Sequence, residues 1–175
     1  MRTSHDLGSE GVTAGIIGAT AVAVWFLLVD LLAGHPLYTP ALLGVLLTRA
    51  LGSIFLAPSL SAATVDPDHI RASYVILYTV FHYAAFIATG VLAVALVHGS
   101  RRNPSVLALL LMLFVAFEVA FTAFASLLGM SHLRSLAWYQ VAAGNLIAAL
   151  SMGTYLWRTH PALATDLDQT LRGDV

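Results

Sequence analysis

Residues 12–33 of this 175-residue chain read VTAGIIGATAVAVWFLLVDLLA, an apolar run with a single carboxylate, Asp30, near its end. At about 1.5 Å of helical rise per residue, a run of this length crosses the roughly 30 Å hydrocarbon core of a bilayer. Gly34 and Pro36 follow directly, and this order predicts the end of a helix. The run is also longer than the apolar core of a signal peptide, which has about 7 to 15 residues. We therefore expect a retained transmembrane helix.

The composition of the whole chain favours the same environment. Hydrophobic residues make up 59% of the sequence and charged residues 10%, and the mean hydropathy is +0.85. Soluble domains carry roughly 45 to 50% apolar and about 25% charged residues, so lipid is the expected solvent. Arginine supplies all positive charge and the net charge is -1, which offers no basic surface for nucleic acid. Since the chain has no cysteine, any metal would need His, carboxylate or amide ligands.

Three further segments are long and apolar enough to cross a bilayer, and they are residues 70–97, 104–128 and 133–157. Pro104 lies in the first turn of its segment, where proline is tolerated, and Gly129 separates the third span from the fourth. We therefore predict an all-α polytopic membrane protein. Its four transmembrane helices are expected to form one antiparallel bundle over residues 12–157, with no soluble domain attached.

The stretch between the first two spans contains a shorter apolar segment, residues 41–57, with Arg49 in its middle. Prolines flank it, at Pro40 and Pro58. On insertion scales, an arginine at the centre of a membrane helix costs about 2.5 to 3.5 kcal/mol. We therefore favour a short interfacial helix, with its polar residues toward water or headgroups, over a fifth crossing.

Arginine placement predicts the orientation of the chain, because cytoplasmic loops of membrane proteins carry an excess of positive charge. With the N-terminus in the cytoplasm, the inner side holds Arg2, Arg101, Arg102, Arg158 and Arg172, and the outer side holds Arg49, Arg71 and Arg134. This excess predicts that both tails, residues 1–11 and 158–175, are cytoplasmic. In a bacterium the location would be the cytoplasmic, or inner, membrane.

Polar groups within the predicted spans are expected to face the bundle interior, because exposing them to hydrocarbon is costly. One such group occurs in each span, and the four are Asp30, His82, Glu118 and Asn145. Counted from the outer ends of the helices at about 1.5 Å per residue, the last three lie within a turn of one another, and Asp30 lies nearer the surface. Tyr78 shares a helix face with His82. We therefore predict a polar cluster inside the bundle.

Two interpretations of this cluster remain open. In the functional one, His82, Glu118 and Asp30 hold a divalent metal such as zinc, copper or iron, or relay protons or other ions. Asn145 would then orient one of these groups by a hydrogen bond. In the structural one, a protonated Glu118 donates a hydrogen bond to His82 or Asn145 and fixes the helix register without any ligand.

A second group of histidines, expected at the outer membrane boundary, is an alternative metal site and comprises His35, His69 and His132. Imidazole suits zinc and copper, although histidine is also common at membrane boundaries and loop residues need not converge. Haem is disfavoured, because a bis-histidine site needs two imidazoles at similar depth and His82 has no such partner in the sequence.

Three classes of function remain open. The favoured one is a small membrane protein whose His and carboxylate cluster binds a divalent metal or relays protons or ions. The first alternative is a non-catalytic accessory or assembly subunit of a larger membrane complex. The second alternative is an intramembrane enzyme acting on a lipid-like substrate, for which the sequence identifies no catalytic residue.

The lipid bilayer is the expected partner in every case, together with further copies of the chain or a larger complex. Helices in lipid associate through small residues that let their backbones approach closely. Such residues recur at spacing four in three of the spans. They are Gly15, Ala19 and Ala23 in the first span, Ala85, Thr89 and Ala93 in the second, and Gly144 and Ala148 in the fourth.

Overall fold

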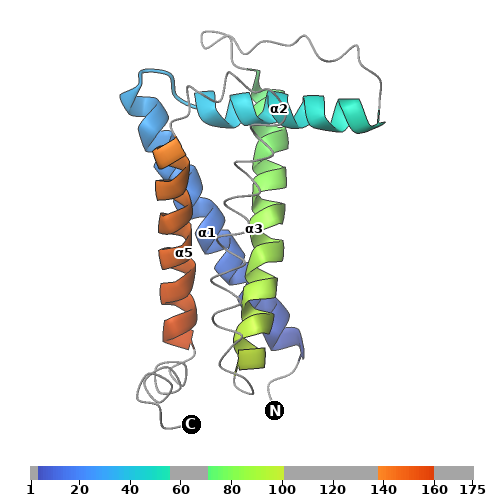
Figure 1. Cartoon of the computed structure of the whole chain (residues 1–175), viewed down its shortest axis with the longest axis vertical. Helices are drawn as coiled ribbons and strands as arrows, with labels where there is room; N and C mark the ends of the chain where they lie inside the picture. The colour runs from blue at the N-terminus through green and yellow to red at the C-terminus, as the bar shows by residue number, and fades with distance from the viewer. Residues whose placement is uncertain (1–3, 56–70, 101–137, 160–175) are drawn as a thin grey trace.

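The computed structural model describes residues 4–55, 71–100 and 138–159, and every element within these ranges is a helix (Figure 1). The helices are α1 (Ser4–Leu32), α2 (Tyr38–Phe55), α3 (Ala72–Ser100) and α5 (Trp138–Thr159). The all-α prediction is confirmed for this part of the chain. The predicted span 104–128 with Glu118, and the histidines His69 and His132, lie outside the described residues.

Two of these helices are long and apolar enough to cross a membrane, over Gly8–Leu32 in α1 and Ala72–Leu96 in α3. Both match the first two predicted spans. α1 begins at Ser4 rather than at residue 12. The prediction placed its start where hydropathy rises, whereas the helical hydrogen bonds continue through the polar residues before that point, because backbone bonding does not require apolar side chains.

The end of α1 is fixed by a glycine. Gly34 has a φ of +81°, the left-handed conformation that glycine adopts without steric cost. Its N–H donates to the carbonyl of Leu31 at 3.1 Å, and the N–H of His35 donates to that of Asp30 at 3.0 Å. This is the Schellman arrangement, which satisfies the last carbonyls of a helix. The sequence prediction that α1 ends at Gly34, before Pro36, is confirmed.

α1 and α3 pack with their backbones in close contact. A Cβ atom added at Gly15 would lie 2.5 Å from the Cα of Ile87, and one added at Gly11 would lie 2.5 Å from the Cα of Val91. Glycine is therefore required at both positions if the helices are to keep this separation. Gly11 lies against Val91, and Gly15, which comes later in α1, lies against the earlier residue Ile87 of α3. The two helices therefore run in opposite directions.

The predicted contact faces are correct on α1 in part and wrong on most of α3. On α1, Gly15 and Ala19 are buried but Ala23 is exposed. On α3, Ala93 is buried but Ala85 and Thr89 are exposed. The face that α3 turns toward α1 instead carries Ile87, Gly90 and Val91, which lie against the backbone of the α1 glycines. The predicted small residues of α5, which are Gly144 and Ala148, are buried.

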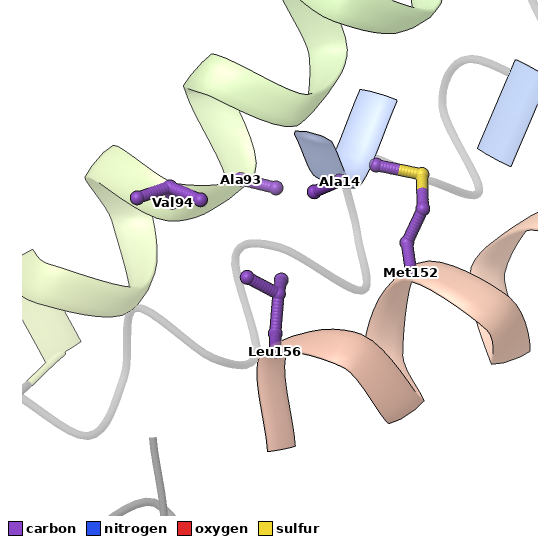
Figure 2. Close-up of a cluster of buried hydrophobic side chains, with 5 residues drawn as sticks. All are labelled: Ala14, Ala93, Val94, Met152 and Leu156. Carbon is purple, nitrogen blue, oxygen red and sulfur yellow. The ribbon is translucent and has the colours of Figure 1, made fainter. Parts of the chain in front are cut away.

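α5 packs on a second side of α1. A Cβ at Gly18 would lie 2.5 Å from the sulfur of Met152, so this methionine side chain fills the space that the glycine leaves. Figure 2 shows Met152 and Leu156 of α5 pointing toward Ala14 of α1, with Ala93 and Val94 of α3 beside them. Three helices thus share one buried apolar cluster, in which α1 contacts both of the others.

α2 lies across α3 near its N-terminal end (Figure 1). It spans Tyr38–Phe55, close to the predicted range 41–57, and Pro40 falls inside its first turn rather than before it. Proline is tolerated there because the first N–H groups of a helix have no intrahelical acceptor. The crossing is tight, since an added Cβ at Gly44 would collide with the backbone of Tyr74.

Candidate functional site

His82 is the buried polar residue in the middle of α3, with only 8% of its surface exposed. Its Nε2 lies 3.1 Å from the carbonyl oxygen of Ala19 in α1. A carbonyl oxygen only accepts, so Nε2 carries a proton and donates it in this bond. When the ring is neutral, Nδ1 is then the acceptor, and the hydroxyl of Tyr78 donates to it over a long 3.4 Å.

Aromatic rings surround this imidazole. The ring centroids of Phe86, Tyr78 and Tyr83 lie 4.7, 5.4 and 5.9 Å from that of His82. The tautomer of His82 is therefore set by a backbone group on one side, and its remaining lone pair faces a phenol on the other. Such a ring can hold two helices together, and it can also exchange a proton or bind a metal through Nδ1.

Asp30 is buried near the C-terminal end of α1, with 4% of its surface exposed. Its Oδ2 accepts from the backbone N–H of Thr39 at 2.8 Å, and its Oδ1 accepts from the Thr39 hydroxyl at 2.6 Å. Thr39 lies in the first turn of α2, where backbone N–H groups lack helical acceptors. Leu37, which precedes α2, has no side-chain oxygen to cap it. The carboxylate of α1 therefore caps α2.

His82 and Asp30 lie at different levels along α1, and the sequence prediction likewise put Asp30 nearer the membrane surface than the other three polar groups. Asp30 and Ala19, the contact of His82, are separated by about 16 Å of helix at 1.5 Å per residue. Asn145 neighbours Gly144, which lies against Trp25 of α1. At 1.5 Å per residue, Trp25 lies about 9 Å along α1 from Ala19. The described helices give His82 and Asp30 the partners named above, and the predicted contact of His82 with Glu118 stays a prediction because Glu118 lies outside the described residues.

The structure places His35 exposed in the turn between α1 and α2. Within the residues described, no three His, Asp or Glu side chains come together as a group that could hold a metal ion. Glu118, His69 and His132 lie outside the described residues, so the metal predictions that include them stay predictions.

Besides the bond of His82 to Ala19, three further residue pairs in the described bundle form bonds that were not foreseen from the sequence. The indole N–H of Trp25 donates to the carbonyl of Gln140 at 2.9 Å, and Thr39 binds Asp30 as given above. The hydroxyls of Thr20 and Tyr83 lie 3.0 Å apart and bridge α1 and α3. Carbonyl acceptors leave no mark in a sequence, whereas the threonine in the first turn of α2 could have been found as a candidate partner for a nearby carboxylate.

The chain was also compared with known proteins. No family model matches the sequence, and no curated protein or solved structure shows significant similarity to it. The function is therefore argued from the residues and contacts described above.

Proposed function

We propose that this chain is a four-span membrane protein that acts as a non-catalytic accessory or assembly subunit of a larger membrane complex. α1, α3 and α5 would be three of the spans and residues 104–128 the fourth, with α2 in the interface. One observation supports the fourth span. α3 ends at the opposite end of the bundle from the start of α5 (Figure 1), and the apolar residues 104–128 are long enough to make that return.

The orientation that we propose puts both termini in the cytoplasm. The last residue of α3, Ser100, immediately precedes the pair Arg101 and Arg102, and Arg158 lies in the last turn of α5. Both helices end at the same end of the bundle, where α1 begins (Figure 1). A concentration of arginine at that end is what the positive-inside rule associates with the cytoplasmic face.

The accessory role rests on how the buried polar groups of the described helices are used. His82 binds the backbone of Ala19, Asp30 binds Thr39, and Trp25 binds the backbone of Gln140. Each bond joins two different helices. In hydrocarbon, such bonds act as links between helices. Polar groups with these partners support a role in architecture better than one in chemistry.

The substitution His82→Ala tests this role. We expect the purified variant to lose stability, because the Ala19 carbonyl loses its donor, by about 0.6 to 1.7 kcal/mol for one interhelical bond. We also expect the parent protein to be colourless and metal-free by absorption and elemental analysis. The matched control is Tyr78→Phe, which removes only the long bond to Nδ1 and should change stability little. Stoichiometric metal that is lost in a folded His82→Ala variant would overturn the accessory role.

A second candidate function, binding of a divalent metal or relay of protons, is favoured by the tautomer of His82. Histidines that bind metals usually donate their other ring N–H to a carbonyl or carboxylate, which fixes the ring and leaves one lone pair for the metal. The bond from Nε2 to Ala19 has this form. In this proposal Glu118, with Asn145 near it, would complete the site, and zinc, copper or iron would be the ion. Loss of metal on Glu118→Gln, with unchanged helix content, is the result expected.

A further inference from the structure

We propose that the face of α1 and α3 that carries Thr20 and Tyr83 is an interface for a second copy of this chain. This hydroxyl face comprises Ile16, Thr20 and Val24 of α1, and Ile76, Val80 and Tyr83 of α3. The inference rests on the membrane placement given under the proposed function. It adds to that function a partner and the surface that the partner would bind.

Thr20 uses its hydroxyl differently from most other threonines of the described helices. Six of them donate to the carbonyl four residues earlier, the usual way for a threonine to satisfy its hydroxyl inside a helix, and they are Thr13, Thr48, Thr79, Thr89, Thr154 and Thr159. Thr20 instead lies 3.0 Å from the Tyr83 hydroxyl. Two hydroxyls have two protons, and this bond uses one of them, so the pair keeps one proton to donate.

The pair lies at the middle of the hydrocarbon region. Thr20 is the central residue of the span Gly8–Leu32, and Tyr83 is next to the centre of the span Ala72–Leu96. Thr20 is exposed and Tyr83 is half-buried. Acyl chains offer no hydrogen-bond acceptor, so lipid cannot satisfy a hydroxyl proton at this depth.

The surface around the pair is apolar and continuous. On α1, Ile16 and Val24 lie one turn on either side of Thr20, and both are exposed. On α3, Val80 and Ile76 extend the same stripe from Tyr83 and are 65% and 62% exposed. On α1 the hydroxyl pair thus has an exposed apolar neighbour on either side, and on α3 both exposed neighbours lie on the N-terminal side of Tyr83.

A second copy fits this surface because the hydroxyl pair is complementary to itself. Each pair offers one proton and has free acceptor lone pairs, so two copies related by a two-fold axis satisfy each other with two equal bonds. Lipid can cover the apolar side chains of this face but cannot form the two hydrogen bonds.

The test uses the absence of native cysteine. Val80→Cys is placed on the hydroxyl face, and Leu150→Cys, on the exposed side of α5 at 61% exposure, is the matched control. Both variants are reconstituted in phosphatidylcholine vesicles over a range of protein-to-lipid ratios and oxidised with copper phenanthroline. We expect a disulfide dimer with Val80→Cys at dilutions where Leu150→Cys remains monomeric.

The combined variant Thr20→Val, Tyr83→Phe in the Val80→Cys background should raise the dissociation constant of the dimer roughly tenfold, as expected for the loss of two membrane hydrogen bonds. If it does not fold, Tyr83→Phe alone serves the same comparison. Equal cross-linking at positions 80 and 150, or cross-linking that the hydroxyl substitutions leave unchanged, would overturn the inference. Resistance of the parent protein to alkaline extraction tests membrane insertion separately, so failure of the dimer and failure of the proposed placement give different results.

Discussion

Asp30 in α1 accepts two hydrogen bonds from one residue of α2, Thr39, and both residues are buried. The two bonds reach separate carboxylate oxygens, so the side chain of Asp30 is held in one orientation. Together with the left-handed Gly34, they determine the angle at which α2 leaves α1. A carboxylate that the sequence presents as a membrane-embedded charge is thus part of a helix corner.

Replacing Asp30 by Ala should destabilise the protein by about 1 to 3 kcal/mol, because the substitution removes a helix cap and leaves the buried Thr39 groups without an acceptor. Thermal unfolding followed by circular dichroism in detergent measures the loss. Thr39→Ser keeps the backbone N–H and a hydroxyl, and it is expected to stay close to the parent. If the Asp30→Ala and Thr39→Ser variants melted together, Asp30 would not cap α2.

Replacing Leu37 by Asn should stabilise the protein by about 0.5 to 1 kcal/mol. Leu37 has a φ of +68°, which costs a branched or long side chain roughly 1 to 2 kcal/mol and which asparagine adopts more readily. The side chain is 44% exposed, so little packing is lost. Leu51→Asn, at a similarly exposed position within α2, is the control and should not stabilise. A lower melting temperature for Leu37→Asn would contradict the expectation.

Replacing Gly15 by Ala should destabilise the pairing of α1 and α3 by about 1 to 3 kcal/mol, since the new methyl group meets the backbone of Ile87 and the helices must move apart. Gly153 provides a matched control within α5, because nothing lies within 4 Å of a Cβ added there. Gly153→Ala should be neutral or stabilising by up to about 1 kcal/mol through helix propensity. Equal effects of the two substitutions in unfolding experiments would exclude the close backbone contact.

Replacing Trp25 by Phe should cost at least about 0.6 to 1.7 kcal/mol, because the indole donor to Gln140 is lost while a smaller aromatic ring remains. Trp157, which is exposed near the end of α5, provides the control substitution Trp157→Phe. Tryptophan fluorescence and melting temperature together report the change. A Trp25→Phe variant as stable as Trp157→Phe would show that this bond does not hold α1 to α5.

Hydropathy and glycine placement predicted most of the described helices. The Gly34 and Pro36 pair located the end of α1, and the arginine in the middle of residues 41–57 separated α2 from the spans. Hydropathy reports only how apolar a segment is, however, and so it placed the start of α1 too late. The contact face of α3 was wrong for a related reason. Ala85 and Thr89 have the spacing of a packing face, but α3 turns Ile87, Gly90 and Val91 toward the glycines of α1 instead.

The predicted polar cluster depended on depth alone. Depth along separate helices does not determine which way a side chain faces or how helices cross. The closest partner of His82 is a carbonyl of Ala19, which is indistinguishable in sequence from every other carbonyl. The partner of Asp30 is Thr39, nine residues later in the chain. The two meet across a turn whose geometry depends on Gly34 and Leu37.

The central place of α1 also has a consequence for biogenesis. α1 leaves the ribosome before α3 and α5, the two described helices that cover it. In the proposed membrane placement, Gly11 and Gly15 have only lipid or the insertion machinery against them until α3 is inserted. Nascent chains that stop before α3 should therefore be the species most readily degraded by membrane quality control, and chains that include α3 should be protected.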